Sequence, residues 1–276
     1  MSNLSHPRAR PETRAIDLAR CPSCRARLGG NFECVACGRI LTQVDGILEA
    51  IGHLSGTNRI AAALYDGPGW VRFKPLEQAF LFFQGPGRSA ARRRVLRFLP
   101  DLPEARVLEV GLGDGDNLPL LPEPWSVFGV DLARNRLNRC RERFPRMTNR
   151  LALAEAEDLP FLDESFDAVF TVGGINYFRD PAAALREMKR VVKTGGTVVA
   201  ADENPDLHRL ALGRVLGFEA LDAWCLRLSG LGAEFVEMVH TTPARVGLAA
   251  AEAWPKHVRH HIWNRLGYCL VDVREG

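Results

Sequence analysis

Short apolar runs that stop at a glycine or a carboxylate recur along the middle of the chain. Residues 106–110 and residues 127–130 are too short for buried helices. The first run stops at Gly111 and the second at Asp131, which predicts buried strands followed by turns. Further strands are predicted at 150–153, 166–172 and 197–201, and helices at 88–99, 137–144 and 182–192. Strands that alternate with helices indicate an α/β fold.

The last part of the chain has a different pattern. Residues 207–231 predict a helix that is interrupted by two glycines. Residues 234–239 and 268–273 alternate apolar and polar side chains, which predicts an antiparallel strand pair that closes the sheet. A helical insert is predicted between them at 241–266, with three histidines on its exposed side: His257, His260 and His261.

A glycine-rich turn, residues 109–115 with the sequence EVGLGDG, follows the first of these strands. Glycines permit positive φ angles and the close approach of a ligand. Together with Asp131 at the tip of the next strand, the turn is typical of a nucleoside site in which the acid binds the ribose hydroxyls. A dinucleotide presents a pyrophosphate, which carboxylates repel. Glu109, Asp114 and Asp116 therefore favour the cationic S-adenosylmethionine.

The glycine turn and the Val-Asp pair that follows resemble the class I S-adenosylmethionine-dependent methyltransferases. Residues 154–161, 165–170 and 185–196 fit the subgroup that includes quinone-biosynthesis C-methyltransferases and many small-molecule methyltransferases. The resemblance implies a Rossmann-like, seven-stranded doubly wound sheet with an antiparallel last strand. Glu155 stands where this group usually has aspartate. The residues that the resemblance places at the cofactor are Tyr65, Glu109, Gly111, Gly113, Gly115, Asp131, Leu132, Glu155, Ala156, Val172 and Gly173.

Four cysteines near the N-terminus form two pairs with the same spacing. Cys21 and Cys24 make one CxxC, Cys34 and Cys37 make the second, and nine residues separate the pairs. This spacing predicts a four-thiolate Zn²⁺ site, and four thiolates leave no open position, so we expect a structural zinc. The segment resembles the zinc ribbon of tRNA-methyltransferase activator subunits. The lone cysteines are expected to be small buried groups: Cys140, Cys225 and Cys269.

Composition and charge set the broad class. With 46% hydrophobic and 25% charged residues and a net charge of +3, the chain has the composition of an ordinary globular protein. No apolar run has the length of a membrane span, and the N-terminus lacks the apolar core of a secretory signal, so a cytoplasmic protein is expected. We divide the chain into a disordered N-terminus (1–18), a zinc ribbon (19–51), lid and connector helices (52–100) and a methyltransferase core (101–276).

No residue stands out as a catalyst. The candidates by position are Asn176, Tyr177, His208 and His240. Our first hypothesis is in-line methyl transfer to a small, aromatic or apolar acceptor, a reaction that depends chiefly on positioning. The second is an rRNA or tRNA base methyltransferase that docks RNA through the ribbon, and the third is a non-catalytic adaptor. The oligomeric state stays open.

Overall fold

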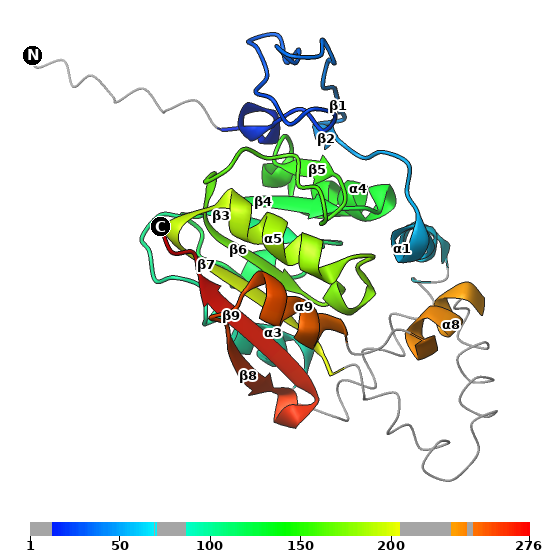
Figure 1. Cartoon of the computed structure of the whole chain (residues 1–276), viewed down its shortest axis with the longest axis vertical. Helices are drawn as coiled ribbons and strands as arrows, with labels where there is room; N and C mark the ends of the chain where they lie inside the picture. Colours follow the sequence, from blue (N-terminus) through cyan, green and yellow to red (C-terminus); the bar gives the residue numbers. More distant parts are fainter. Residues whose placement is uncertain (1–12, 69, 71–86, 205–232, 242–244) are drawn as a thin grey trace, which may run out of the picture.

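The computed structural model describes residues 13–68, 70, 87–204, 233–241 and 245–276. A nine-stranded sheet runs through the molecule in the order β1-β2-β5-β4-β3-β6-β7-β9-β8 (Figure 1). Its strands are β1 (Gln43–Val44), β2 (Ile47–Glu49), β3 (Arg106–Val110), β4 (Ser126–Asp131), β5 (Leu151–Leu153), β6 (Phe166–Val172), β7 (Val192–Glu203), β8 (Val258–Ile262) and β9 (Gly267–Val273). The predicted strands at 106–110 and 166–172 have the observed bounds.

Seven of these strands form the Rossmann-like sheet that the sequence predicted. β5, β4, β3, β6 and β7 pair in parallel, and β9 pairs antiparallel with β7. β8 pairs antiparallel with β9 at the edge. The other two strands come from the predicted ribbon: β1 and β2 form a hairpin, and β2 pairs in parallel with β5. The segment that carries the cysteines therefore extends the main sheet.

Helices cover both faces of the sheet. They are α1 (Gly56–Asp66), α3 (Arg88–Leu96), α4 (Arg134–Arg143), α5 (Pro181–Val191), α8 (Ala233–Thr241) and α9 (Arg245–Ala253). α5 begins where Asp180 accepts a hydrogen bond from the Ala183 amide, with Pro181 in the first turn. Short 3₁₀ helices are η1 (Ala15–Leu18), η2 (Leu118–Leu120), η3 (Pro145–Met147), η4 (Ile175–Tyr177) and η6 (Trp263–Arg265).

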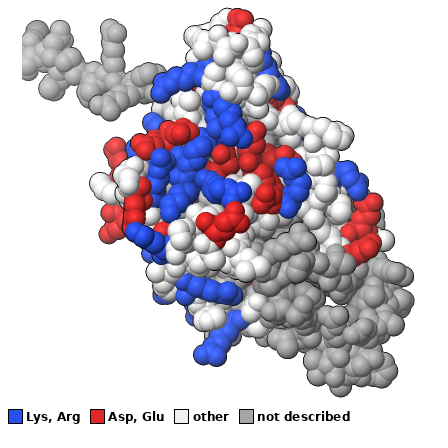
Figure 2. All heavy atoms as spheres, viewed as in Figure 1, with Lys and Arg blue, Asp and Glu red and all other residues white. Residues whose placement is uncertain are grey.

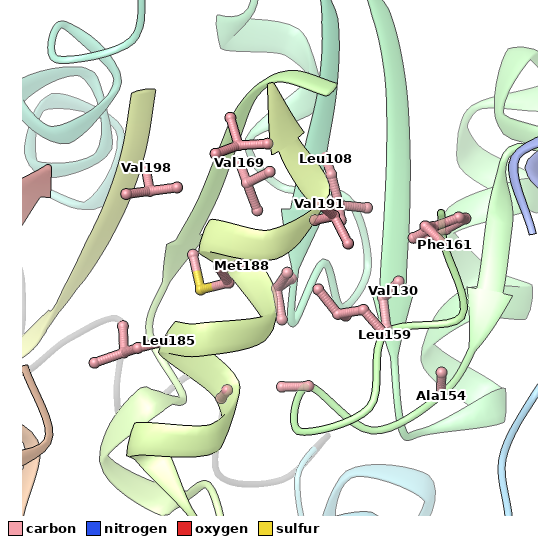
Figure 3. Close-up of a cluster of buried hydrophobic side chains, with 14 of the residues drawn as sticks. Leu108, Val130, Ala154, Leu159, Phe161, Val169, Leu185, Met188, Val191 and Val198 are labelled. Carbon is pink, nitrogen blue, oxygen red and sulfur yellow. The ribbon is translucent and has the colours of Figure 1, made fainter. Parts of the chain in front are cut away.

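Two apolar cores lie on opposite faces of the sheet. In the first, Leu185 and Met188 of α5 pack over Leu108 and Val169 (Figure 3). In the second, α3 and α4 pack on the other face, where Leu137 belongs to the same buried cluster as Val107, Val127 and Phe170. Alternate residues of one strand thus face different cores, which is the pattern of a sheet covered on both sides.

Two predictions for the C-terminal part are wrong. Residues 233–241 form α8 rather than a strand. Among the side chains of α8 that the structure describes, Phe235 and Met238 are buried, and their separation of three positions suits a helix. The predicted insert at 241–266 contains α9 and also the edge strand β8, so His260 lies on a strand, where its ring stacks on Phe98 at 4.4 Å. The predicted helix at 207–231 lies outside the described residues.

The N-terminal boundary also differs from the prediction. Ala15 and Ile16 are buried in the first core, so the predicted disorder does not extend through residue 18. Cys140 and Cys269 are buried, as predicted, whereas Cys225 lies outside the described residues. None of the helices in the described ranges is long and apolar enough to cross a membrane.

Candidate functional site

The residues predicted to bind the cofactor follow four neighbouring strands. The glycine turn follows β3, Asp131 ends β4, Glu155 follows β5 and Gly173 follows β6. Parallel pairing brings these carboxyl ends to one edge of the sheet, where doubly wound folds bind ligands. Three more predicted residues lie at the same edge: Leu132, Ala156 and Val172. The last one, Tyr65, lies on α1.

The glycine turn has the backbone geometry that its sequence suggested. Gly111, Gly113 and Gly115 all have positive φ angles, between 59° and 77°. The Asp131 carboxylate accepts hydrogen bonds from the amides of Gly113 (2.8 Å) and Ala133 (2.9 Å), which ties the turn to the tip of β4. Desolvation raises the pKa of Asp131, and the Arg136 guanidinium and these two amides act against that rise.

The acidic charge of the turn is largely compensated by arginines of α4. Asp114 lies 3.0 Å from Nε of Arg136 and 3.3 Å from Nε of Arg139. Asp116 pairs with Arg143 at 2.8 Å. Because these arginines balance Asp114 and Asp116, the turn does not present unbalanced negative charge. Its carboxylates therefore do not distinguish a pyrophosphate from a cationic cofactor.

Glu109 is buried at the end of β3. One of its oxygens accepts a hydrogen bond from Asn117 Nδ2 at 2.6 Å, while Oε2 has no hydrogen-bond partner among the described residues. Desolvation raises the pKa of Glu109 to about 8 against the opposing effects of Asn117 and Arg92. The Glu109 side chain is therefore mostly protonated at neutral pH.

We predict that Glu109→Gln removes a pH dependence of stability. A carboxyl group whose pKa is higher in the folded than in the unfolded chain binds more protons when folded, so the free energy of unfolding falls as pH rises between the two values. For Glu109 this window runs from 4.5 to about 8. Across this window the free energy of unfolding of the wild type should fall by about 5 kcal/mol, and that of the Gln variant should not, as measured by urea denaturation. Glu104→Gln, at an exposed position before β3, is the control, and equal pH profiles of both variants would contradict the prediction.

Glu155, one of the residues that the resemblance places at the cofactor, contacts helix α1. Asn58 of α1 is fully buried, and its Nδ2 donates to Glu155 Oε1 at 3.1 Å and to Glu157 Oε2 at 3.0 Å. The side-chain oxygen of Asn58, Oδ1, accepts a hydrogen bond from the Arg179 backbone amide at 3.1 Å. Glu155 also lies 3.6 Å from the Arg179 guanidinium. Asn58 thus joins α1 to the loops that follow β5 and η4.

The other end of α1 contacts helix α4, whose Arg136 lies beside the glycine turn. The Arg136 guanidinium lies over the rings of Tyr65 (5.3 Å) and Trp70 (5.2 Å), which themselves meet edge to face. A Cβ on Gly113 would lie 2.3 Å from Arg136 Nη2, so glycine is required there for this packing. Asp66 accepts from the Asn135 amide at 2.8 Å in the first turn of α4. Helix α1 therefore covers the carboxyl edge of the sheet, with Asn58 bound to the loops at one end and Asp66 bound to α4 at the other.

The catalytic candidates have different positions. Asn176 is buried, donates to Glu203 O and accepts from the Tyr268 hydroxyl at 2.8 Å, so its amide is engaged on both sides. Tyr177 packs against Phe235 of α8, with ring centroids 5.6 Å apart. His240 belongs to α8, and His208 lies outside the described residues. Burial and the charge of Asp202 raise the pKa of Tyr268 well above its usual value, which excludes it as a base near neutral pH.

The four cysteines meet in one cluster. Their sulfur atoms all lie within 4.8 Å of one another, with Cys24 and Cys34 3.2 Å apart and Cys21 and Cys37 3.6 Å apart. Thiolates at about 2.3 Å from a tetrahedral Zn²⁺ are separated by similar distances. The donor set therefore fits zinc.

The sequence did not predict two residues of the site, Asn58 and Arg136. Asn58 is one polar position in an otherwise apolar buried face of α1, which in retrospect marks a polar contact. Arg136 is one arginine in a helix that contains several, and nothing distinguishes it from its neighbours before the fold is known.

Comparison with known proteins gives the edge of the sheet its context. Residues 108–200 match the family model described as methyltransferase domain. Phosphatidylethanolamine N-methyltransferase of Cereibacter sphaeroides is 37% identical over 109 residues, which are 36% of this chain and 54% of that protein. Fatty-acid O-methyltransferase of Mycolicibacterium smegmatis is 34% identical over 108 residues (38% and 39%). The ubiquinone/menaquinone biosynthesis C-methyltransferase of Geotalea daltonii is 30% identical over 116 residues (39% and 49%).

The chain spans about half the length of the curated relatives it matches. The matched segment begins in β3 and ends in β7, so it includes the loops that follow β3, β4, β5 and β6 at the carboxyl edge. Helix α1 lies outside it. Residues 108–200 of this chain are therefore similar to a methyltransferase domain.

Proposed function

We propose that this protein is an S-adenosylmethionine-dependent methyltransferase that acts on a small acceptor of aromatic or apolar character by in-line displacement. One observation carries the proposal. The segment that matches the methyltransferase-domain model contains the glycine turn, Asp131, Glu155 and Gly173, and all of them lie at one edge of the sheet.

The residues at this edge fit the cofactor. Each carboxylate oxygen has two lone pairs, so Asp131 can accept from ribose hydroxyls in addition to the two amides that it binds. A Cβ on Gly173 would have no atom within 4 Å, so the end of β6 is open. Glu109 Oε2 and Thr171 Oγ1 are buried near the turn without a hydrogen-bond partner among the described residues. Such atoms are available to a ligand.

An apolar cluster beside this edge supports the proposed character of the acceptor. Leu64, Trp70, Phe235 and Met238 are buried together where α1 meets α8, and Tyr65 and Tyr177 pack against them. Apolar walls favour an apolar or aromatic acceptor and keep water away from it. The relatives are named as N-, O- and C-methyltransferases, so we leave the acceptor atom open.

Positioning does most of the work in this chemistry. When bound, S-adenosylmethionine supplies a methyl group that is already activated, so the protein has to hold the acceptor in line with it. A base is needed only when the acceptor must lose a proton. Asn176, whose amide is engaged on both sides, orients the loop after β6 rather than serving as that base. We also propose that Zn²⁺ holds the four cysteines and has a structural role.

The experiment uses the full-length, zinc-loaded protein. Calorimetry should give binding heat with S-adenosylmethionine and with S-adenosylhomocysteine, and none with a nicotinamide dinucleotide. Labelled S-adenosylmethionine is then incubated with phospholipid amines, fatty acids, quinols and bulk RNA, and the methylated product is identified. Label in a small molecule supports the proposal. Label in RNA alone would establish the base methyltransferase instead, and binding without transfer to any acceptor would favour an adaptor.

The surface gives little support to the RNA alternative. On the face shown in Figure 2, basic and acidic side chains are interspersed rather than gathered into an area of one sign. Phosphate recognition depends on concentrated positive charge, and the net charge of the chain is +3.

A further inference from the structure

The N-terminal module, residues 13–50, is attached to the sheet on both sides of one loop. The first attachment is the pairing of β2 with β5, which ends where Glu49 lies opposite Leu153. The Ala50 amide then donates to Leu153 O at 3.1 Å. This contact reaches the last residue of β5, directly before the loop at 154–158 that carries Glu155 and Ala156.

The second attachment lies on the far side of the same loop. Ala19 forms an antiparallel bridge with Phe161, and the Arg20 amide donates to Pro160 O at 3.0 Å. The Leu162 amide donates to Leu18 O at 2.8 Å. Leu159 and Phe161 pack into the first core near this contact (Figure 3). The module thus holds both ends of the 154–158 loop.

The Arg20 side chain makes the second attachment specific. This side chain is 5% exposed, and its Nη2 lies 2.9 Å from Asp158 and 2.9 Å from Glu187. Its Nε donates to Leu159 O at 3.2 Å. Glu187 in turn accepts from the Leu159 amide at 2.9 Å. A planar guanidinium can serve all three acceptors at once, whereas a lysine ammonium on a flexible stem cannot match that geometry.

The loop itself is a closed turn that leaves little freedom between its ends. The Asp158 amide donates to Glu155 O at 3.3 Å, and the Ala154 amide donates to Asp131 O at 3.1 Å. A displacement of Asp158 therefore moves Glu155, and through Ala154 it reaches the tip of β4. Cys21, a residue of the sulfur cluster, follows Arg20 directly, so a bound metal would hold the backbone from which Arg20 extends.

We infer that Arg20 is a positioning residue for the cofactor, and that the N-terminal module completes the side of the site formed by the 154–158 loop. The inference rests on the proposed function, because it concerns the same cofactor. It assigns the cysteine module a role in cofactor affinity, beyond packing and beyond docking of a partner.

The test compares Arg20→Gln and Arg20→Lys with the matched control Arg25→Gln. Arg25 also approaches Asp158, at 3.9 Å, but its side chain is 65% exposed. Affinity for S-adenosylhomocysteine is measured by calorimetry, together with zinc content and melting temperature. We expect Arg20→Gln to bind about tenfold more weakly with full zinc content, Arg20→Lys to be intermediate, and Arg25→Gln to equal the wild type.

Arg20→Gln should fold, because Glu187 keeps its pair with Arg190 at 2.7 Å and no buried carboxylate is left alone. If it does not fold, Asp158→Ala is the second variant, because alanine has no acceptor for the Arg20 hydrogen bond and the Asp158 side chain is partly exposed. Unchanged affinity in the folded variant would overturn the inference and leave the proposed function intact. A wild type that binds neither S-adenosylmethionine nor S-adenosylhomocysteine would instead overturn the proposed function.

Discussion

Replacement of Cys24 by serine should cost the protein its metal and its solubility before it affects the chemistry. The N-terminal module contributes Ile16, Ile47 and Leu48 to the two cores, and β2 covers the edge of β5. Loss of one thiolate should release the proposed zinc, and a structural metal stabilises the fold of a module this small. We expect the melting temperature to fall by about 10 °C and the protein to aggregate through the uncovered β5 edge.

The measurements are zinc content, thermal denaturation and size-exclusion chromatography. Val35→Ser is the matched control, since this residue lies within the second CxxC and is 75% exposed. The control should keep both its zinc and its melting temperature. A Cys24→Ser variant that stays folded and monomeric and binds S-adenosylhomocysteine like the wild type, yet is inactive, would show that the cluster is part of the reaction rather than of the fold.

Asp131→Ala should weaken cofactor binding by about 100-fold. A carboxylate that accepts two ribose hydroxyls contributes hydrogen bonds to a charged group, each of which stabilises a complex by about 1.5–3 kcal/mol when buried. The substitution also releases the Gly113 amide from Asp131, so the glycine turn loses its tie to β4. Calorimetry with S-adenosylhomocysteine measures the loss.

Two controls separate binding from folding in this experiment. Asp101→Ala removes an exposed carboxylate near β3 and should leave the affinity unchanged. Circular dichroism and the melting temperature of Asp131→Ala should show a folded protein. A folded variant with wild-type affinity would place the cofactor elsewhere on the chain.

The parallel strands were predictable because their signals are local. A run such as 106–110 is mainly apolar, too short for a buried helix and followed by glycine. These three features together indicate a buried strand rather than a helix. Residues 234–239 lacked such punctuation. The apolar positions of this segment fit helical spacing as well as strand alternation: Phe235, Val236, Met238 and Val239. The choice between helix and strand depends on the packing of Phe235 and Met238 with Leu64 and Trp70, which the sequence does not reveal.

The contacts of the site were less predictable because they join distant segments. Asp114 looked like free negative charge, since Arg136 is more than twenty positions away in the sequence and approaches it only after α4 packs on the sheet. Arg20 likewise carried no distinguishing mark in the sequence, whereas the fold buries it against Glu187. The cysteine spacing could be recognised, but that its hairpin would pair with β5 could not.

The pairing of β2 with β5 has a consequence for how the chain reaches this state during synthesis. The ribosome releases Ile47 long before it makes Leu151, the residue that Ile47 must pair with, and at about 5–20 residues per second the interval lasts several seconds. During that time the hairpin has no sheet to join. A metal captured early by the nascent cysteines would keep the hairpin in shape until its neighbour strand emerges, so zinc supply during translation should govern the yield of native protein.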